Sequence, residues 1–159
     1  MNKRFIFIIF FIFCFVLKID ESYLTITNKI IAKVDNQIIS SYELKNKIMI
    51  ILFLSKKQLN QNNIDKTKNF ALRSLIDNKL KKNEVINYKI KADKNDVKNY
   101  LGALSANFNT DIEGFEKLMD QNGIDFDLFL DEIKNEYAWQ RLVFRLYKDK
   151  IVLNEQEVI

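Results

Sequence analysis

Few residues of this 159-residue chain could perform acid–base, nucleophilic or metal chemistry. The chain contains no histidine, which excludes a catalytic triad, a histidine general base and a histidine metal site. Its one cysteine, Cys14, lies in an apolar run near the N-terminus, so the remaining residues provide neither a thiol nucleophile nor a disulfide. We therefore predict no catalytic residue and no cofactor.

One stretch has part of the pattern of a calcium-binding loop. Asn109, Asp111 and Glu113 alternate along it, and Gly114 occupies the sixth position. The twelfth position holds Asp120, where such a loop has a bidentate glutamate, and a helix that begins inside the stretch would consume the loop. We therefore predict no metal site.

A second group of carboxylates lies close together at residues 125–132. Its members are Asp125, Asp127, Asp131 and Glu132. Acidic residues are favoured in the first turns of a helix, where they interact with the positive end of its dipole. A hydrolytic carboxylate pair would instead need a cleft and a raised pKa, which nothing in the sequence indicates.

The basic residues do not form a patch typical of nucleic-acid binding. The chain has a net charge of +4, and without the three basic residues and one acidic residue of the first 20 this falls to about +2. Lys79, Lys81 and Lys82 are predicted to form a solvated helix face. We therefore expect no nucleic-acid partner.

Apolar residues in excess of what helix packing requires are the remaining candidates for a functional surface. Residues 48–54 are apolar on all sides of a predicted helix, and so is the region that surrounds residues 139–146. The candidate peptide-binding residues are Ile48, Met49, Ile51, Leu52, Trp139, Leu142, Val143 and Leu146. Two alternatives stay open: these residues pack an ordinary core, or they await a helix supplied by a second copy or by another chain.

The fold that must position these residues is predicted to be mainly α, with a short N-terminal β-hairpin followed by about five helices. The absence of proline and the presence of only three glycines favour long helices. Two β-prone runs, 30–34 and 37–39, flank Asp35-Asn36, a dipeptide that suits a tight turn. Ser40 and Glu43 form a capping-box pattern that predicts a helix over about 41–56.

Four further helices follow from capping signals and apolar spacing. They are predicted at about 65–87, after Asp93, after a second capping box that begins at Thr110, and at about 125–149, with Gly123 at a helix end. The positions expected to face the core on the first of these helices are Phe70, Leu72, Leu75, Ile76 and Leu80, and the pattern resumes at Val85 and Ile86.

The N-terminus has the pattern of a targeting segment. A basic start precedes 13 apolar residues, Phe5 to Leu17, which is typical of a signal-peptide core and shorter than the roughly 20 residues of a membrane span. We predict that residues 1–20 are a signal peptide or an N-terminal anchor. The sequence thus predicts export across a membrane, with membrane contact only through residues 5–17 if the segment is not cleaved.

Residues 30–158 together resemble the N-terminal chaperone domain of the SurA family of periplasmic proteins. The resemblance rests on IIAKVDNQIISSYEL, on ALRSLIDNKLKKNEV followed by YKIKADKNDVKNYL, and on TDIEGFEKLMDQNGIDFDLFLDEIKNE. The family pattern includes a glycine, an aromatic residue, an isoleucine and an acid, which correspond in this sequence to Gly123, Phe129, Ile133 and Glu136. Leu130 departs from it, because the family usually has an arginine there. Residues 151–159 resemble the start of a linker to a parvulin domain.

The resemblance implies a helical chaperone domain over residues 30–150. It implies a non-catalytic periplasmic holdase that binds unfolded outer-membrane proteins or other apolar polypeptide segments and aids their folding and assembly. The alternative is the N-terminal part of a parvulin-type peptidyl-prolyl isomerase whose catalytic domain lies elsewhere. We predict no isomerase activity for these 159 residues.

Overall fold

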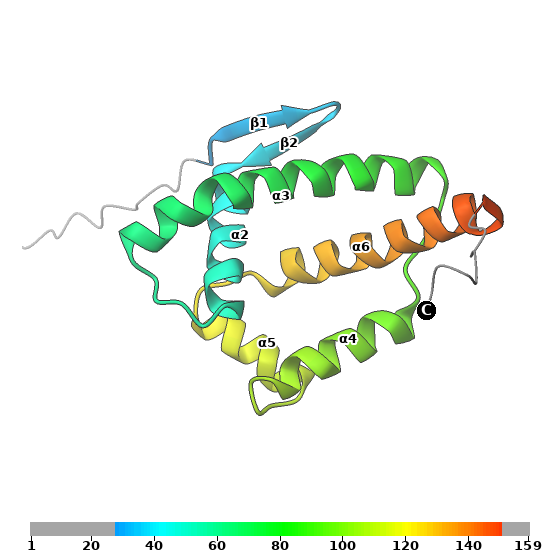
Figure 1. Ribbon diagram of the computed structural model, residues 1–159. Helices are drawn as coiled ribbons and strands as arrows, with labels where there is room; N and C mark the ends of the chain where they lie inside the picture. Colours follow the sequence, from blue (N-terminus) through cyan, green and yellow to red (C-terminus); the bar gives the residue numbers. More distant parts are fainter. Residues whose placement is uncertain (1–27, 151–159) are drawn as a thin grey trace, which may run out of the picture.

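The computed structural model describes residues 28–150 and confirms a mainly α fold with a short N-terminal hairpin (Figure 1). The elements in chain order are β1 (Ile30–Val34), β2 (Gln37–Ser40), α2 (Ser41–Leu54), α3 (Gln61–Asn87), α4 (Lys94–Ala106), α5 (Ile112–Gln121), α6 (Phe126–Tyr147) and a final 3-10 turn, η1 (Lys148–Lys150). The predicted targeting run 5–17 and linker 151–159 lie outside the described residues.

The hairpin forms where the sequence predicts it. Its strands are antiparallel, and Val34 pairs with Gln37 across the turn. Asp35 has a φ of 50°, the left-handed conformation that aspartate tolerates in a tight turn. Because side chains alternate along a strand, Val34 and Ile39 face the helices and are buried. The hairpin therefore covers one edge of the helical body.

The predicted capping box at the start of α2 is confirmed. The Ser40 hydroxyl accepts a hydrogen bond from the Glu43 backbone N–H at 3.1 Å, and the Glu43 carboxylate accepts one from the Ser40 N–H at 2.8 Å. Both unpaired donors at the helix start are thereby satisfied. The helix ends at Leu54, two residues before the predicted end, where Lys56 adopts a positive φ of 53°.

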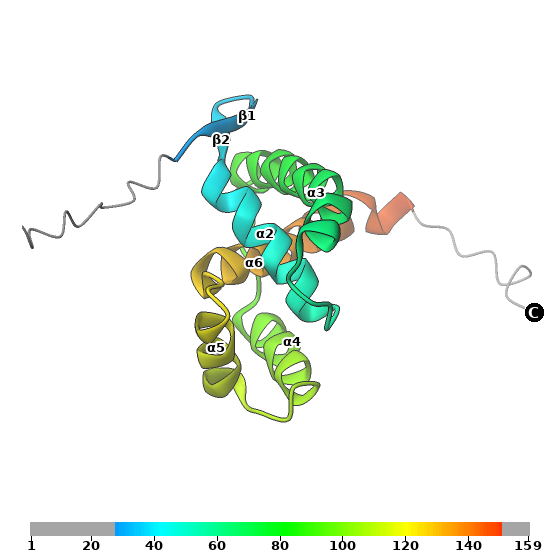
Figure 2. The ribbon, with the colours of Figure 1, turned by 90° about the vertical axis from the view of Figure 1, so that its left-hand side faces the viewer.

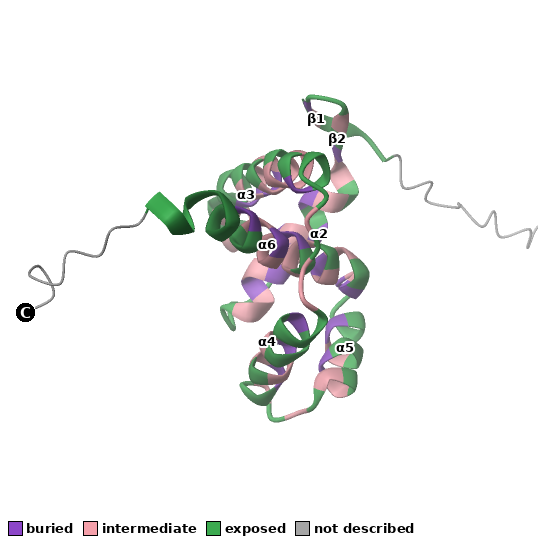
Figure 3. Cartoon of the chain, turned by 90° about the vertical axis from the view of Figure 1, so that its right-hand side faces the viewer, coloured by how far each residue is buried: buried purple, intermediate pink, exposed green. Residues whose placement is uncertain are grey.

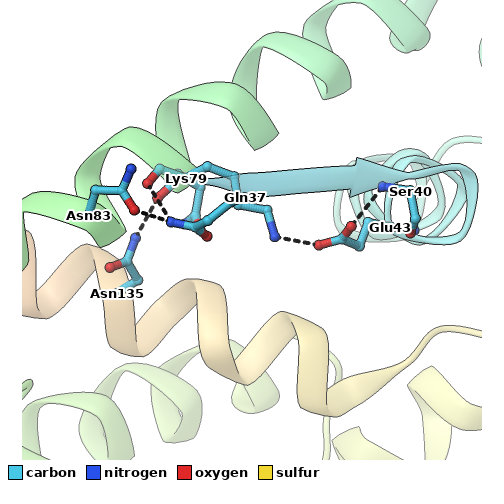
Figure 4. Close-up of polar contacts among 7 residues, drawn as sticks. Gln37, Ser40, Glu43, Lys79, Asn83 and Asn135 are labelled. Carbon is cyan, nitrogen blue, oxygen red and sulfur yellow. Dashed lines mark hydrogen bonds and ion pairs between the residues drawn. The ribbon is translucent and has the colours of Figure 1, made fainter. Parts of the chain in front are cut away.

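Glu43 also connects the hairpin and α2 to α3 (Figure 4). Lys79 of α3 donates to the Glu43 carboxylate at 2.6 Å, and the Gln37 side-chain amide donates to the Lys79 carbonyl at 3.3 Å and to the Asn83 side chain. Burial alone would raise the pKa of Glu43, but the hydrogen bonds from Lys79 and Ser40 outweigh it. The pKa of Glu43 therefore lies below its usual value.

Helix α3 differs from the prediction at its start and in the side that it buries. It begins at Gln61 instead of residue 65, because the Asn60 side chain accepts from the Asn63 N–H at 2.9 Å and caps it. Phe70 and Leu80, expected in the core, are 64% and 45% exposed. Ile86, also expected in the core, is 60% exposed. Leu75 and Val85 are buried as predicted, and Ala71 is buried beside them. The buried side of α3 is thus narrower than predicted and faces α2 and α6.

The remaining helix ends follow local signals, with one correction. Asp93 caps α4 and Gly123 ends α5 with a φ of 68°, both as predicted. The prediction that Thr110 caps α5 is wrong: Asp111 does so, accepting from the Gly114 N–H at 2.8 Å. Thr110 still belongs to the turn that ends α4, since its N–H donates to the Ser105 carbonyl at 3.3 Å.

Helix α6 occupies the centre of the described structure. It lies between α3 on one side and α4 on the other, while α2 crosses near its N-terminal end (Figures 1 and 2). Buried apolar residues form three clusters instead of one continuous core. One joins α2 to α4, α5 and α6, another joins the hairpin and α2 to α3, and the smallest joins the C-terminal end of α3 to α6.

Two buried asparagines hold α6 against its neighbours. The Asn46 side chain accepts from the Asp125 backbone N–H at 2.7 Å and donates to the Asp125 carbonyl at 3.2 Å, which fixes the start of α6 against α2. The Asn135 amide donates to the Asn78 carbonyl of α3 at 2.9 Å. A buried amide that loses such a partner leaves an unsatisfied polar group, so these bonds define where the helices cross.

The Glu43 junction generates a prediction about acid stability. A carboxylate with a lowered folded-state pKa contributes stability above its unfolded value of 4.5, and this contribution is lost as pH falls through the lower folded value. We expect Glu43→Gln to lower the free energy of unfolding at pH 7 by about 1 kcal/mol. The loss should shrink as pH falls below 4.5.

Urea unfolding of both chains across this pH range measures the difference. Glu113→Gln is the control, because Glu113 forms an exposed ion pair with Lys117 within one helix. A Glu43→Gln loss that is the same at pH 3 and pH 7 would contradict the prediction.

Candidate functional site

The four candidate residues on α2 lie between two of the apolar clusters. Ile48 and Leu52 are buried in the cluster beneath the hairpin, and the half-buried Ile51 packs against it. Met49, on the opposite side of the helix, packs against the cluster formed with α4, α5 and α6. Helix α2 is thus apolar all round because it packs on two sides. Met49 and Leu52 also line a hollow of about 460 Å³ near the end of α2.

The four candidate residues on α6 are divided between core and surface. Leu142 is buried against Val85, and Trp139 is half-buried beside it. Val143 and Leu146 are exposed, and the last turns of α6 are exposed as a whole (Figure 3). The α2 and α6 candidates belong to separate clusters, so the structure does not join them into one groove.

A different part of the structure forms an apolar cleft of about 750 Å³. We call it the apolar cleft and define it by six apolar residues that line it. They are Val85 and Ile86 at the end of α3, Ala92 in the α3–α4 connection, Val97 and Leu101 on α4, and Ala138 on α6. Four of the six are buried, so the cleft has an apolar floor formed by three helices.

The edge of the apolar cleft carries positive charge. The lysines that line it are Lys82, Lys91, Lys94, Lys98 and Lys134. The carboxylates that line it are Asp93 and Asp131, and each already pairs with a cation, Arg141 and Lys134 respectively, at 3.7 Å. An apolar floor with a polar, charged rim is the arrangement expected of a binding site for apolar ligands.

Sequence reasoning missed this cleft, since none of the eight candidate residues lines it. Its signal was the small size of Ala92 and Ala138, both of which line it. A pattern search for large apolar residues passes over alanines, although small residues at a helix interface are what leaves room for a ligand.

The polar residues singled out in the sequence have structural partners. Asp125 caps α6 and accepts a hydrogen bond from the Tyr42 hydroxyl at 2.9 Å, which raises the pKa of Tyr42. Glu132 pairs with Lys47 between α6 and α2. The prediction that the α3 lysines are only solvated is wrong for two of them: Lys79 pairs with Glu43, and Lys81 pairs with Glu136 at 2.5 Å. These ion pairs join helices.

Within residues 28–150, no group of three carboxylate, cysteine or histidine side chains is close enough to hold a metal ion. Asp111, in the stretch that has part of a calcium-loop pattern, caps α5. Burial raises the pKa of Tyr100, with a further contribution from Tyr137, so Tyr100 stays protonated at neutral pH.

Comparison with known proteins gives one family. The family model described as the SurA-like N-terminal domain matches residues 2–143. No curated protein matches the chain. Among residues 28–150, every helix is too short or too polar to cross a membrane.

The geometry of the apolar cleft predicts that it binds an apolar fluorophore. We expect the full chain to increase the fluorescence of Nile red, and Ala92→Leu to reduce that increase at least twofold, because the larger side chain occupies part of the cleft. Dye titration measures this directly, with circular dichroism to establish that the helices are retained.

The matched control is Ala103→Leu, the same substitution at an exposed site on α4 that lines none of the hollows described here. Equal losses of dye binding in the two variants would contradict the assignment of the cleft as the binding surface.

Proposed function

The chain belongs to the SurA-like N-terminal domain family, and on this basis we propose that it is a holding chaperone for unfolded outer-membrane proteins. The family is one of periplasmic chaperones, which supports a polypeptide as the ligand. In this proposal the chain binds apolar segments of its clients without catalysis, keeps them from aggregating and releases them for folding and assembly.

The observation that carries the proposal is the apolar cleft with its lysine rim. A holding chaperone must bind many sequences weakly, so it needs an accessible apolar surface and few directional contacts. The cleft floor supplies apolar contact area from Val85, Val97, Leu101 and Ala138. The rim lysines keep the surface soluble. Because their side chains are long and flexible, they can move aside and surround the floor without closing it.

One exposed apolar residue at the cleft edge extends the proposed surface, and two candidate residues are exposed elsewhere on α6. Ile86 lies at the cleft edge and is 60% exposed. Val143 and Leu146, two of the eight candidate residues, are exposed farther along α6. Ile48, Leu52 and Leu142 are buried, so a client would have to displace their neighbours to reach them. The proposal therefore rests on the cleft and on the accessible candidates.

The proposal places the chain in the periplasm. Its support is the family and the basic start and apolar run of residues 1–17, which have the pattern of an export signal. The proposed partners are unfolded outer-membrane proteins, with a second copy or a partner helix as the other occupant of the exposed apolar surface.

A second candidate function is the N-terminal part of a parvulin-type prolyl isomerase. It is favoured by residues 151–159, which resemble the start of a linker to a parvulin domain. Both functions predict no isomerase activity for these 159 residues, so the natural reading frame separates them. A parvulin domain encoded after residue 159 would favour the second function, and a stop codon there would favour the holding function.

Suppression of client aggregation tests the proposed function. We expect the full chain, at near-equimolar concentration, to reduce light scattering when a denatured outer-membrane porin is diluted into buffer. Ile86→Asn should weaken this suppression about threefold, because it replaces an apolar contact at the cleft edge with a polar one.

The matched control is Ile30→Asn. Ile30 is exposed to a similar degree, 66%, but it lies on the hairpin away from the cleft. A chain that folds normally and leaves porin scattering unchanged would refute the holding function. Equal losses in both variants would remove the cleft from it.

A further inference from the structure

A second hollow adjoins the apolar cleft on the other side of the α3–α4 connection. It has a volume of about 1220 Å³ and lies between the start of α4 and the C-terminal half of α6. We call it the basic hollow because six cations line it: Lys89, Lys91, Lys94, Arg141, Arg145 and Lys148. Asp93 and Asp96 are the carboxylates that line it. Positive charge therefore exceeds negative charge by four.

Most of these cations have no internal partner among residues 28–150. Arg141 pairs with Asp93 at 3.7 Å. The other five form no ion pair with a carboxylate of the described residues. Like charges that face one hollow repel each other, and a concave surface concentrates their field. An anionic ligand would relieve this repulsion and form ion pairs that the chain itself does not provide.

The two hollows adjoin the same segment. Residues 90–94 line both of them, and Lys91 and Lys94 belong to both rims. A polypeptide whose apolar part lies in the apolar cleft therefore needs to cross only this short segment to reach the basic hollow. Phe144, 66% exposed, lines the basic hollow and offers an apolar contact there as well.

The shape of the basic hollow favours a polypeptide over a lipid surface. A bilayer is flat and would contact the outermost side chains only, whereas an extended chain can enter a concave site. The apolar cleft beside it also calls for a ligand that is apolar in one part and charged in the next, along a single chain.

We propose that the preferred clients carry an acidic stretch immediately next to an apolar stretch, the apolar part in the apolar cleft and the acidic part in the basic hollow. This inference rests on the proposed function and names its substrate class. Apolar contact contributes affinity for every apolar segment. The lysines and arginines then discriminate among these segments by the charge of the residues that flank them. Since the cations are exposed, salt weakens the selection.

Fluorescence anisotropy with three labelled peptides tests the proposal on the full chain. The peptides share one apolar block of six residues and differ in a following block of four glutamates, four glutamines or four lysines. We expect the glutamate peptide to bind about tenfold more tightly than the glutamine peptide at low salt, because several modest ion pairs act together. The lysine peptide should bind most weakly, and 0.5 M NaCl should remove most of the difference.

A double charge reversal locates the effect. Arg145→Glu with Lys148→Glu changes two exposed residues at the end of α6 that line the basic hollow only. It should abolish the preference for glutamate and leave binding of the glutamine peptide within twofold. Lys66→Glu with Lys68→Glu is the control, an equal change of charge on exposed residues of α3 that line neither hollow.

The outcomes separate this inference from the proposed function. Equal binding of all three peptides would overturn the acidic-flank preference and leave a general holdase. No binding of any peptide would overturn both. Vesicles of phosphatidylglycerol provide the last comparison: vesicle binding that the double reversal abolishes, without any preference among peptides, would assign the basic hollow to a lipid surface and overturn the proposal.

Discussion

The contact between Glu43 and Lys79 fixes the orientation on which the rest of the structure depends. Glu43 completes the capping box of α2 and at the same time binds α3, so one carboxylate sets both the start of a helix and the position of its neighbour. Gln37 adds the hairpin to the same point through the Lys79 carbonyl. The hairpin is thus a brace between α2 and α3. A two-stranded hairpin is only marginally stable alone, so this brace depends in turn on the helices that it joins.

Polar contacts at helix crossings leave the apolar residues free to form separate clusters. Asn46 and Asn135 position α6 by hydrogen bonds to backbone atoms of Asp125 and Asn78, which have fixed geometry and short range. Apolar packing alone would favour sliding toward the largest buried area, because it has no direction. With α6 held in this way, α3, α4 and α6 meet around the apolar cleft without filling it.

The sequence predicts best those features that depend on neighbouring residues. The hairpin turn at Asp35, the capping box of Ser40 and Glu43, the cap at Asp93 and the left-handed Gly123 are all local, and each is confirmed. The errors at the helix starts have equally local causes. Asn60 can cap a helix as well as a later aspartate can, and Asp111 caps one residue after Thr110 by accepting from the Gly114 N–H.

Features that depend on several elements were beyond the sequence pattern. The exposure of Phe70 and Leu80 follows from which side of α3 packs against α2 and α6. The ion pair of Lys79 follows from the contact with α2, and that of Lys81 from the contact with α6. The apolar cleft depends on the small side chains of Ala92 and Ala138, so a count of large apolar residues cannot find it.

The apolar residues on all sides of α2 were ambiguous in the sequence for a similar reason. A helix that packs on two sides and a helix with one exposed binding face have the same sequence pattern. The two cases differ in whether neighbouring elements bury each side of the helix, and this depends on the fold. Among the helices of residues 28–150, the one with the most continuous apolar run, α2, packs on two sides, while an accessible apolar surface lies where α3, α4 and α6 meet incompletely.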